Sequence, residues 1–221
     1  MYAAISADIV SSTSLSGQSM VELTAILKQA MSSLKERYNG FWGRVFHGDS
    51  IECIIADPAD SLEIAIFLKA LIKSFKPADA QCGESFTRYG LRVAIGLGEM
   101  KTINHDLDIM DGEAIYRSGR TLATLKGRSK YSLAISMSNS DLEEQLQVII
   151  NLVNLLLNKA TARRSEILCQ RLLSASAAET ARHIGISKSG VNQALNELGW
   201  SAIEQSINYF HKTVSKICWH N

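Results

Sequence analysis

The order of apolar patterns over residues 1–98 is the feature that most restricts how this chain can fold. Short apolar runs rich in Val, Ile and Phe are typical of strands, whereas apolar residues that recur every three or four positions are typical of amphipathic helices. The predicted strands of this part are 2–10, 41–46, 50–56 and 91–98. The predicted helices run from Ser19 to about Gly40 and over 60–75. The resulting order, β-α-β-β-α-β, predicts an α+β fold of the ferredoxin-like or palm type, whose antiparallel sheet usually runs in the order 4-1-3-2.

That sheet order brings two carboxylates together. Strand 1 lies antiparallel to strand 3, so Asp8, near the end of strand 1, is expected beside Asp49, in the hairpin turn at 47–49. Like charges a few ångströms apart repel unless a cation lies between them. Mg²⁺ typically uses one or two carboxylates together with substrate phosphates. Asp8 and Asp49 are therefore candidate ligands for Mg²⁺ or Mn²⁺, and the alternative is a pair of solvent-exposed turn carboxylates.

The pattern changes near Asn139. Before it, residues 113–126 predict a further amphipathic helix and 131–137 a fifth strand. After it, strand patterns are absent and a long helix is predicted at 141–158, followed by another that ends at Leu173. We therefore expect a first α+β domain over 1–138 and an all-α domain over 139–221. The sequence leaves open whether the helix at 141–158 pairs between chains or packs back on the sheet.

Residues 177–197 have the spacing of a helix-turn-helix unit. A small residue lies where two helices cross, a glycine lies in the turn, and apolar residues lie beneath the second helix. These packing positions are Ala181, Gly185, Ile186, Val191 and Leu195. Ser187 is suited to cap the second helix. The residues expected to contact DNA are Arg182, Ser187, Lys188, Ser189, Asn192, Gln193 and Asn196.

The residue types on that face suit DNA. Asn and Gln can pair bidentately with adenine, and Lys188 and Arg182 can meet phosphate or guanine. From residue 160 onward the chain has 7 Lys and Arg against 4 Asp and Glu, a balance of +3, within a whole-chain charge of +1. A single unit makes few phosphate contacts, so a homodimer is expected. The alternative is a helix-turn-helix that serves only packing or dimerisation.

Composition excludes several other classes. With 46% hydrophobic and 20% charged residues, the chain is of the globular type rather than disordered. It has no apolar run of roughly 18 residues, and its first residues lack the basic region of a signal peptide, so we expect a cytoplasmic protein without membrane insertion. The 4 cysteines are far apart with no Cys-x-x-Cys spacing, which disfavours a zinc or disulfide role.

Several segments resemble the class III nucleotidyl cyclases. The segment D-I-V-S-S-T at 8–13 resembles their D-I-V-G-F-T, and H-G-D-S at 47–50 resembles their G-D hairpin. L-R-V-A-I-G-L-G at 91–98 is similar to their central strand, and G-E-A-I-Y-R-S-G-R at 112–120 to their G-x-x-V-N-x-A-x-R helix. The resemblance implies that Asp8 and Asp49 hold metal and that Arg120 neutralises a triphosphate. The nucleotide-binding candidates are Ile9, Ser11, Ser12, Thr13, Arg44, Asp108, Asp111 and Arg120.

The resemblance is incomplete at the positions that carry catalysis. Tyr116 stands where the cyclases have a catalytic Asn, and Val45 where they have a purine-reading Lys. Arg44 is the candidate replacement for that Lys, although neighbours on a strand face opposite sides. Asp108 or Asp111 is the candidate for the cyclases' second base-reading residue. Nucleotide binding without cyclization is therefore expected of this domain.

Over nearly its whole length the chain also resembles bacterial proteins of the SatD type. That resemblance includes the opening M-Y-x-A-I-x-x-D-I-x-x-S, the hairpin G-D-S and the C-terminal helix-turn-helix, whose string is similar to bacterial transcription regulators. The sequence thus leads to a DNA-binding regulator with a nucleotide-sensing, cyclase-like domain. The alternative is an active metal-dependent nucleotidyl cyclase or phosphoryl or nucleotidyl transferase with a C-terminal dimerisation domain. A weaker third hypothesis is an interaction protein without a working site.

Overall fold

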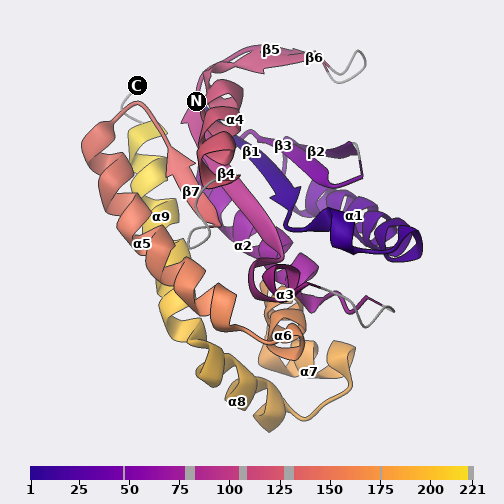
Figure 1. Ribbon diagram of the computed structural model, residues 1–221. Coiled ribbons are helices and arrows are strands. Elements are labelled where there is room, and N and C mark those ends of the chain that lie inside the picture. Colours follow the sequence, from indigo (N-terminus) through magenta and orange to yellow (C-terminus); the bar gives the residue numbers. More distant parts are fainter. Residues whose placement is uncertain (47, 78–82, 105–108, 127–131, 175, 219–221) are drawn as a thin grey trace.

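A five-stranded sheet forms the centre of the α+β fold in the computed structural model (Figure 1), which describes residues 1–46, 48–77, 83–104, 109–126, 132–174 and 176–218. Its strands are β1 (Tyr2–Ile9), β2 (Phe41–Phe46), β3 (Ser50–Ile55), β4 (Leu91–Gly98) and β7 (Leu133–Ser136). Their order is β2-β3-β1-β4-β7, antiparallel except for the parallel pair β4 and β7. The four strands predicted from residues 1–98 and their spatial order are confirmed.

Helices cover both faces of the sheet. Helices α1 (Gly17–Arg37) and α2 (Ser61–Ser74) share the large core with Ala3, Ile5 and Ala7 of β1. Helix α4 (Glu113–Lys126) covers the other face, where Ala114 packs against Ala4. Alternate residues of a strand point to opposite faces, so the near-continuous apolar run of β1 fits burial on both sides. Two short 3₁₀ turns, η1 (Ser12–Ser14) and η2 (Pro58–Asp60), precede α1 and α2.

The C-terminal third is helical, as the sequence predicts. Its helices are α5 (Ser140–Lys159), α6 (Ala162–Leu173), α7 (Ala177–Ile184), α8 (Lys188–Leu198) and α9 (Trp200–Cys218). Asn139, the predicted domain boundary, caps α5 by accepting a hydrogen bond from the Leu142 amide. The large core nevertheless continues across it, because α5 packs on β7 and α9, and α6 packs on α2. The division at residue 138 stays a prediction, and the core gives it no visible break.

Besides the two 3₁₀ turns, one helix and two strands were not predicted. They are α3 (Glu84–Tyr89), β5 (Met100–Asn104) and β6 (Ile109–Gly112). The last two form a separate two-stranded ribbon that projects beyond the sheet (Figure 1). The ribbon is only partly buried, through Met100, Ile103 and Met110, and its two short strands lack the alternation of apolar and polar residues that predicts a strand. In the described part of the chain, no helix has both the length and the hydropathy that crossing a bilayer requires.

Candidate functional site

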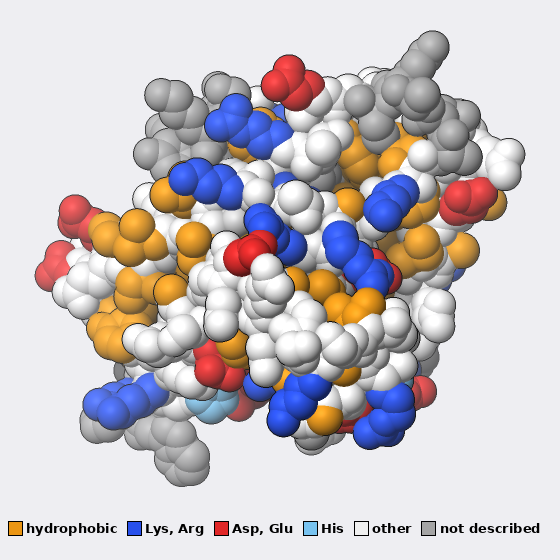
Figure 2. All heavy atoms as spheres, turned by 90° about the horizontal axis from the view of Figure 1, so that it is seen from below, with side chains coloured by type: hydrophobic (Ala, Val, Ile, Leu, Met, Phe, Trp, Pro, Cys, Tyr) orange, Lys and Arg blue, Asp and Glu red, His pale blue; other side chains and the backbone are white. Residues whose placement is uncertain are grey.

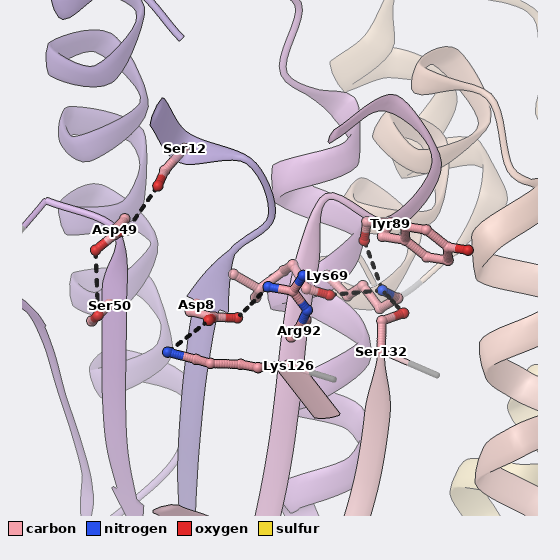
Figure 3. Close-up of polar contacts among 10 residues, drawn as sticks. Asp8, Ser12, Asp49, Ser50, Lys69, Tyr89, Arg92, Lys126 and Ser132 are labelled. Atoms are coloured by element: carbon pink, nitrogen blue, oxygen red, sulfur yellow. Dashed lines mark hydrogen bonds and ion pairs between the residues drawn. The ribbon is translucent and has the colours of Figure 1, made fainter. Parts of the chain in front are cut away.

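Asp8 lies in an ion-paired position at the end of β1. It is 7% exposed, and its register partners are Ser50 on β3 and Arg92 on β4. Its Oδ1 lies 3.4 Å from Arg92 Nη1, and its Oδ2 lies 3.2 Å from Nζ of Lys126, the last residue of α4 (Figure 3). The negative charge of this nearly buried carboxylate is thus balanced by two cations of the chain itself.

Asp49 lies at the same end of the neighbouring strand. Its carbonyl accepts a 2.9 Å hydrogen bond from the Ile9 amide, which places it one register step from Asp8. Its Oδ2 accepts a hydrogen bond from Ser12 Oγ at 2.8 Å, and its Oδ1 accepts one from Ser50 Oγ at 3.3 Å. Figure 3 shows the two carboxylates turned toward different partners, Asp49 toward the serines and Asp8 toward the cations. The strands bring the two residues to one end of the sheet, and their role as metal ligands stays a prediction.

The other predicted residues around this end differ in what they offer a ligand. Ile9 is buried and Thr13 is exposed. Ser11 has a left-handed backbone, with φ +55°, and its carbonyl accepts from the Ser14 amide and hydroxyl. Arg44 lies on the edge strand β2, where its guanidinium binds Glu52 at 2.8 and 3.0 Å and contacts the Trp42 ring. Arg44 is therefore held by its own strand pair.

Arg120 lines a different place, a cavity of about 460 Å³ beside α4 that Asp8 and Asp49 do not line. Its lining includes Lys101, Glu113, Tyr116, Arg117, Arg120 and Ser136. Glu113 accepts from Arg117 at 2.6 and 2.8 Å, and this hydrogen bond lowers the pKa of the Glu113 carboxyl. Among the described lining residues three are basic and one is acidic, a balance that suits an anion.

Tyr116 donates its phenolic hydrogen to Asp111 on β6. This bond and the Asp111 charge raise the pKa of the Tyr116 phenol. Asp111 is thereby engaged by Tyr116. Asp108, the other predicted base-reading residue, lies outside the described residues.

The predicted helix-turn-helix consists of α7, the turn at 185–187 and α8, packed on α6. Gly185 ends α7 with a φ of +71°, a left-handed conformation that glycine adopts without strain. Ser187 Oγ accepts 3.1 Å from the Gly190 amide and so caps α8. The unit has a small core of its own, formed by Ile167, Ala181, Val191 and Leu195.

The outer face of this unit is polar. All of the predicted DNA-contact residues are exposed: Arg182, Ser187, Lys188, Ser189, Asn192, Gln193 and Asn196. Gln193 also donates 3.1 Å to Glu197, which pairs with Arg164 of α6. The view from below, on the side where α7 and α8 lie, shows Lys and Arg side chains spread among polar ones (Figure 2).

A further cluster joins η2 to α9. Asp57, Asp60 and His211 each have a potential ligand atom within 4.8 Å of the others. The chain already uses these groups, because His211 Nε2 lies 3.7 Å from Asp60 Oδ1 and Asp57 Oδ1 accepts from the Ala59 amide. Burial, and then the Asp57 charge, raises the pKa of Asp60. The sequence gives no signal for this cluster, since His211 is far from both aspartates along the chain.

Comparisons with models of protein families, with curated proteins and with solved structures found no match for this chain.

Proposed function

We propose that this protein is a DNA-binding regulator that contacts DNA through α7 and α8. The observation that carries the proposal is the polar, exposed outer face of a helix-turn-helix unit whose buried residues Ala181, Val191 and Leu195 pack into a small core of its own. The second helix of such a unit lies in the major groove, where exposed Asn, Gln and Lys side chains can reach base edges and phosphates.

The absence of exposed large apolar residues from α7 and α8, which the structure describes in full, argues against a helix-turn-helix used only for packing. Protein interfaces are rich in aromatic and other large apolar residues at their centres. Among the described residues, the large hydrophobic side chains that are exposed all lie outside α7 and α8. A face made of Ser, Asn, Gln, Lys and Arg suits a hydrated, negatively charged partner better.

The first prediction tests this face. The double change Asn192→Ala and Gln193→Ala is expected to weaken binding to a selected DNA site about 30-fold, because each bidentate base contact contributes about 1–3 kcal/mol of discrimination. Lys188→Ala is expected to weaken binding to all sequences and to reduce the salt slope by about 1. The site is first selected from random-sequence DNA, and affinity is then measured by fluorescence anisotropy at several salt concentrations.

The matched control is Gln205→Ala with Asn208→Ala, which removes the same residue types from exposed positions on α9. It is expected to leave the affinity unchanged. Equal affinities and salt slopes for wild type, the α8 variants and this control would contradict the assignment.

The second part of the proposal concerns the domain built on the sheet. We propose that it senses a nucleotide, that its architecture is ferredoxin-like and similar to that of the nucleotidyl cyclases, and that the whole chain is of the SatD type. Asp8 and Asp49 are proposed to hold Mg²⁺ or Mn²⁺ with a nucleotide, supported by their positions at one end of neighbouring strands. Lys126, 58% exposed beside Asp8, has to give way to the metal. Once released, Lys126 and Arg92 would face the phosphates.

Binding rather than turnover is the favoured outcome, because a phenol held by Asp111 stands where cyclases have a carboxamide. The alternative remains an active cyclase or transferase, in which two metal ions drive phosphoryl chemistry.

The second prediction is that nucleoside triphosphates bind only with Mg²⁺ or Mn²⁺, and that Asp8→Asn or Asp49→Asn weakens this binding at least about tenfold, because a neutral amide is a poor ligand for these cations. Calorimetry with a panel of triphosphates and cyclic nucleotides measures it, followed by product analysis. Asp141→Asn, in the exposed first turn of α5, is the acidic control and is expected to bind like wild type. Nucleotide binding that does not need metal, or no binding at millimolar nucleotide, would contradict the metal site and leave Asp8 as an ion-pair residue. A reaction product that wild type forms and Asp49→Asn does not would establish the alternative, an active cyclase or transferase.

A further inference from the structure

Helix α5 is apolar on two faces, and the fold uses only one of them. Its buried face packs on β7 and α9 through Leu146, Ile150, Val153 and Leu157. On the other side, Val148, Leu152 and Leu155 are 56%, 61% and 50% exposed. Figure 1 shows α5 as the outermost helix on its side of the molecule, and Figure 2 shows hydrophobic side chains gathered on that same side. A helix that is apolar all round is normally buried all round, so this face lacks a partner in the single chain.

The spacing of the exposed residues fits a second helix as that partner. Leu152 follows Val148 by four positions, and Leu155 follows Leu152 by three. Alternating steps of three and four residues form the seam along which two helices pack knobs into holes.

The charges at the two ends of the seam make it complementary to itself. The exposed Glu144 lies four residues before Val148, and the exposed Lys159 lies four residues after Leu155. If a second α5 runs antiparallel with Val148 facing Leu155, the same register places Glu144 opposite Lys159 at both ends. A parallel pair would instead place each charge opposite its own copy, which is unfavourable.

We propose that two copies of this chain form a dimer in which their α5 helices pack antiparallel across a two-fold axis near Leu152. The contact is isologous, because the same seam is used by both copies. The proposal stands without DNA binding. If α7 and α8 do contact DNA, the dimer sets their two units at opposite ends of α5, whose 20 residues span about 30 Å, close to one turn of duplex DNA.

The test uses the full-length protein and its mass in solution, measured by light scattering and sedimentation from about 1 to 100 µM. Wild type is expected to be a dimer at the upper end of this range. Leu152→Glu is expected to raise the dissociation constant on the order of 30-fold, since it buries two like charges in the seam. Val21→Glu is the matched control, because Val21 is 70% exposed on α1, and it is expected to stay dimeric.

The antiparallel register has its own test. Glu144→Lys is expected to weaken the dimer roughly tenfold through repulsion from Lys159, and Glu144→Lys with Lys159→Glu to restore it. A monomer at 100 µM, or a dimer unaffected by Leu152→Glu, overturns the proposal. A charge reversal without effect, or one that Lys159→Glu does not rescue, overturns the antiparallel pairing.

Discussion

Replacing Lys69 by alanine is expected to lower the free energy of unfolding by about 4 kcal/mol, because it removes three hydrogen bonds and leaves a cavity. Lys69 is 0% exposed in α2, and its Nζ donates to the carbonyls of Tyr89 and Leu91 and to Ser132 Oγ, at 2.7, 2.8 and 2.7 Å (Figure 3). Ser132 Oγ in turn donates 2.9 Å to Asn154 Oδ1 of α5. One side chain thus joins α2, the start of β4, the approach to β7 and α5.

The partners of Lys69 make its loss costly. All three are neutral, so burial, with the nearby Lys73 charge, holds the pKa of Lys69 well below its usual value. The ammonium is tolerated because each of its donors meets an acceptor, and without it the buried Leu91 carbonyl and the partly buried Tyr89 carbonyl lose this donor. An unsatisfied buried group costs about 1–3 kcal/mol.

Urea unfolding followed by circular dichroism measures this prediction. Lys69→Met keeps most of the side-chain volume and is expected to lose about 2 kcal/mol, so its difference from alanine separates the cavity from the hydrogen bonds. Lys76→Ala, on the exposed segment after α2, is the control and is expected to change stability by less than about 0.5 kcal/mol. A loss below about 1 kcal/mol for Lys69→Ala would show that the network contributes little.

The sequence predicts the elements that bury a regular face. The bounds of β2, β4 and α4 agree with the predicted ranges, because each has the apolar period of its own geometry. By contrast, α3 is one short helix of six residues, and β5 and β6 form a ribbon of two short, partly buried strands, so neither the helix nor the ribbon has a long enough pattern. Periodicity also shows that α5 is apolar without showing which of its faces the fold would cover.

The sequence predicts where Asp8 and Asp49 lie in the fold better than it predicts which side chains they contact. Strand order places Asp8 and Asp49 at one end of the sheet, and this follows from the β-α-β-β-α-β pattern. The pairing of Asp8 with Arg92 depends on the register of β1 against β4, and the pairing with Lys126 depends on where α4 ends. A local sequence pattern predicts neither the register of β1 against β4 nor the residue at which α4 ends. The same reasoning explains why Arg120 could not be assigned to a separate cavity beforehand.

The close approach of α4 to the sheet depends on Gly96 in the middle of β4. A Cβ atom at this position would overlap the carbonyl oxygen of Ala114 and come within 2.5 Å of the Ser118 amide nitrogen. Both are backbone atoms of α4, so no side chain can move to make room. At this crossing the Ser6 and Ser118 hydroxyls of β1 and α4 are hydrogen-bonded at 2.8 Å.

Gly96→Ala is therefore expected to lower the free energy of unfolding by about 3 kcal/mol, because α4 must move outward as a unit and gives up its packing on β1 and β4. Gly119→Ala is the control on the same helix: its Cβ would meet nothing within 4 Å. Alanine in an exposed helix position is expected to add about 0.5–1 kcal/mol. Opposite signs for the two changes, measured by urea unfolding, would locate the effect in the contact between helix and sheet. A Gly96→Ala protein as stable as wild type would mean that α4 does not lie on the strand as closely as this arrangement requires.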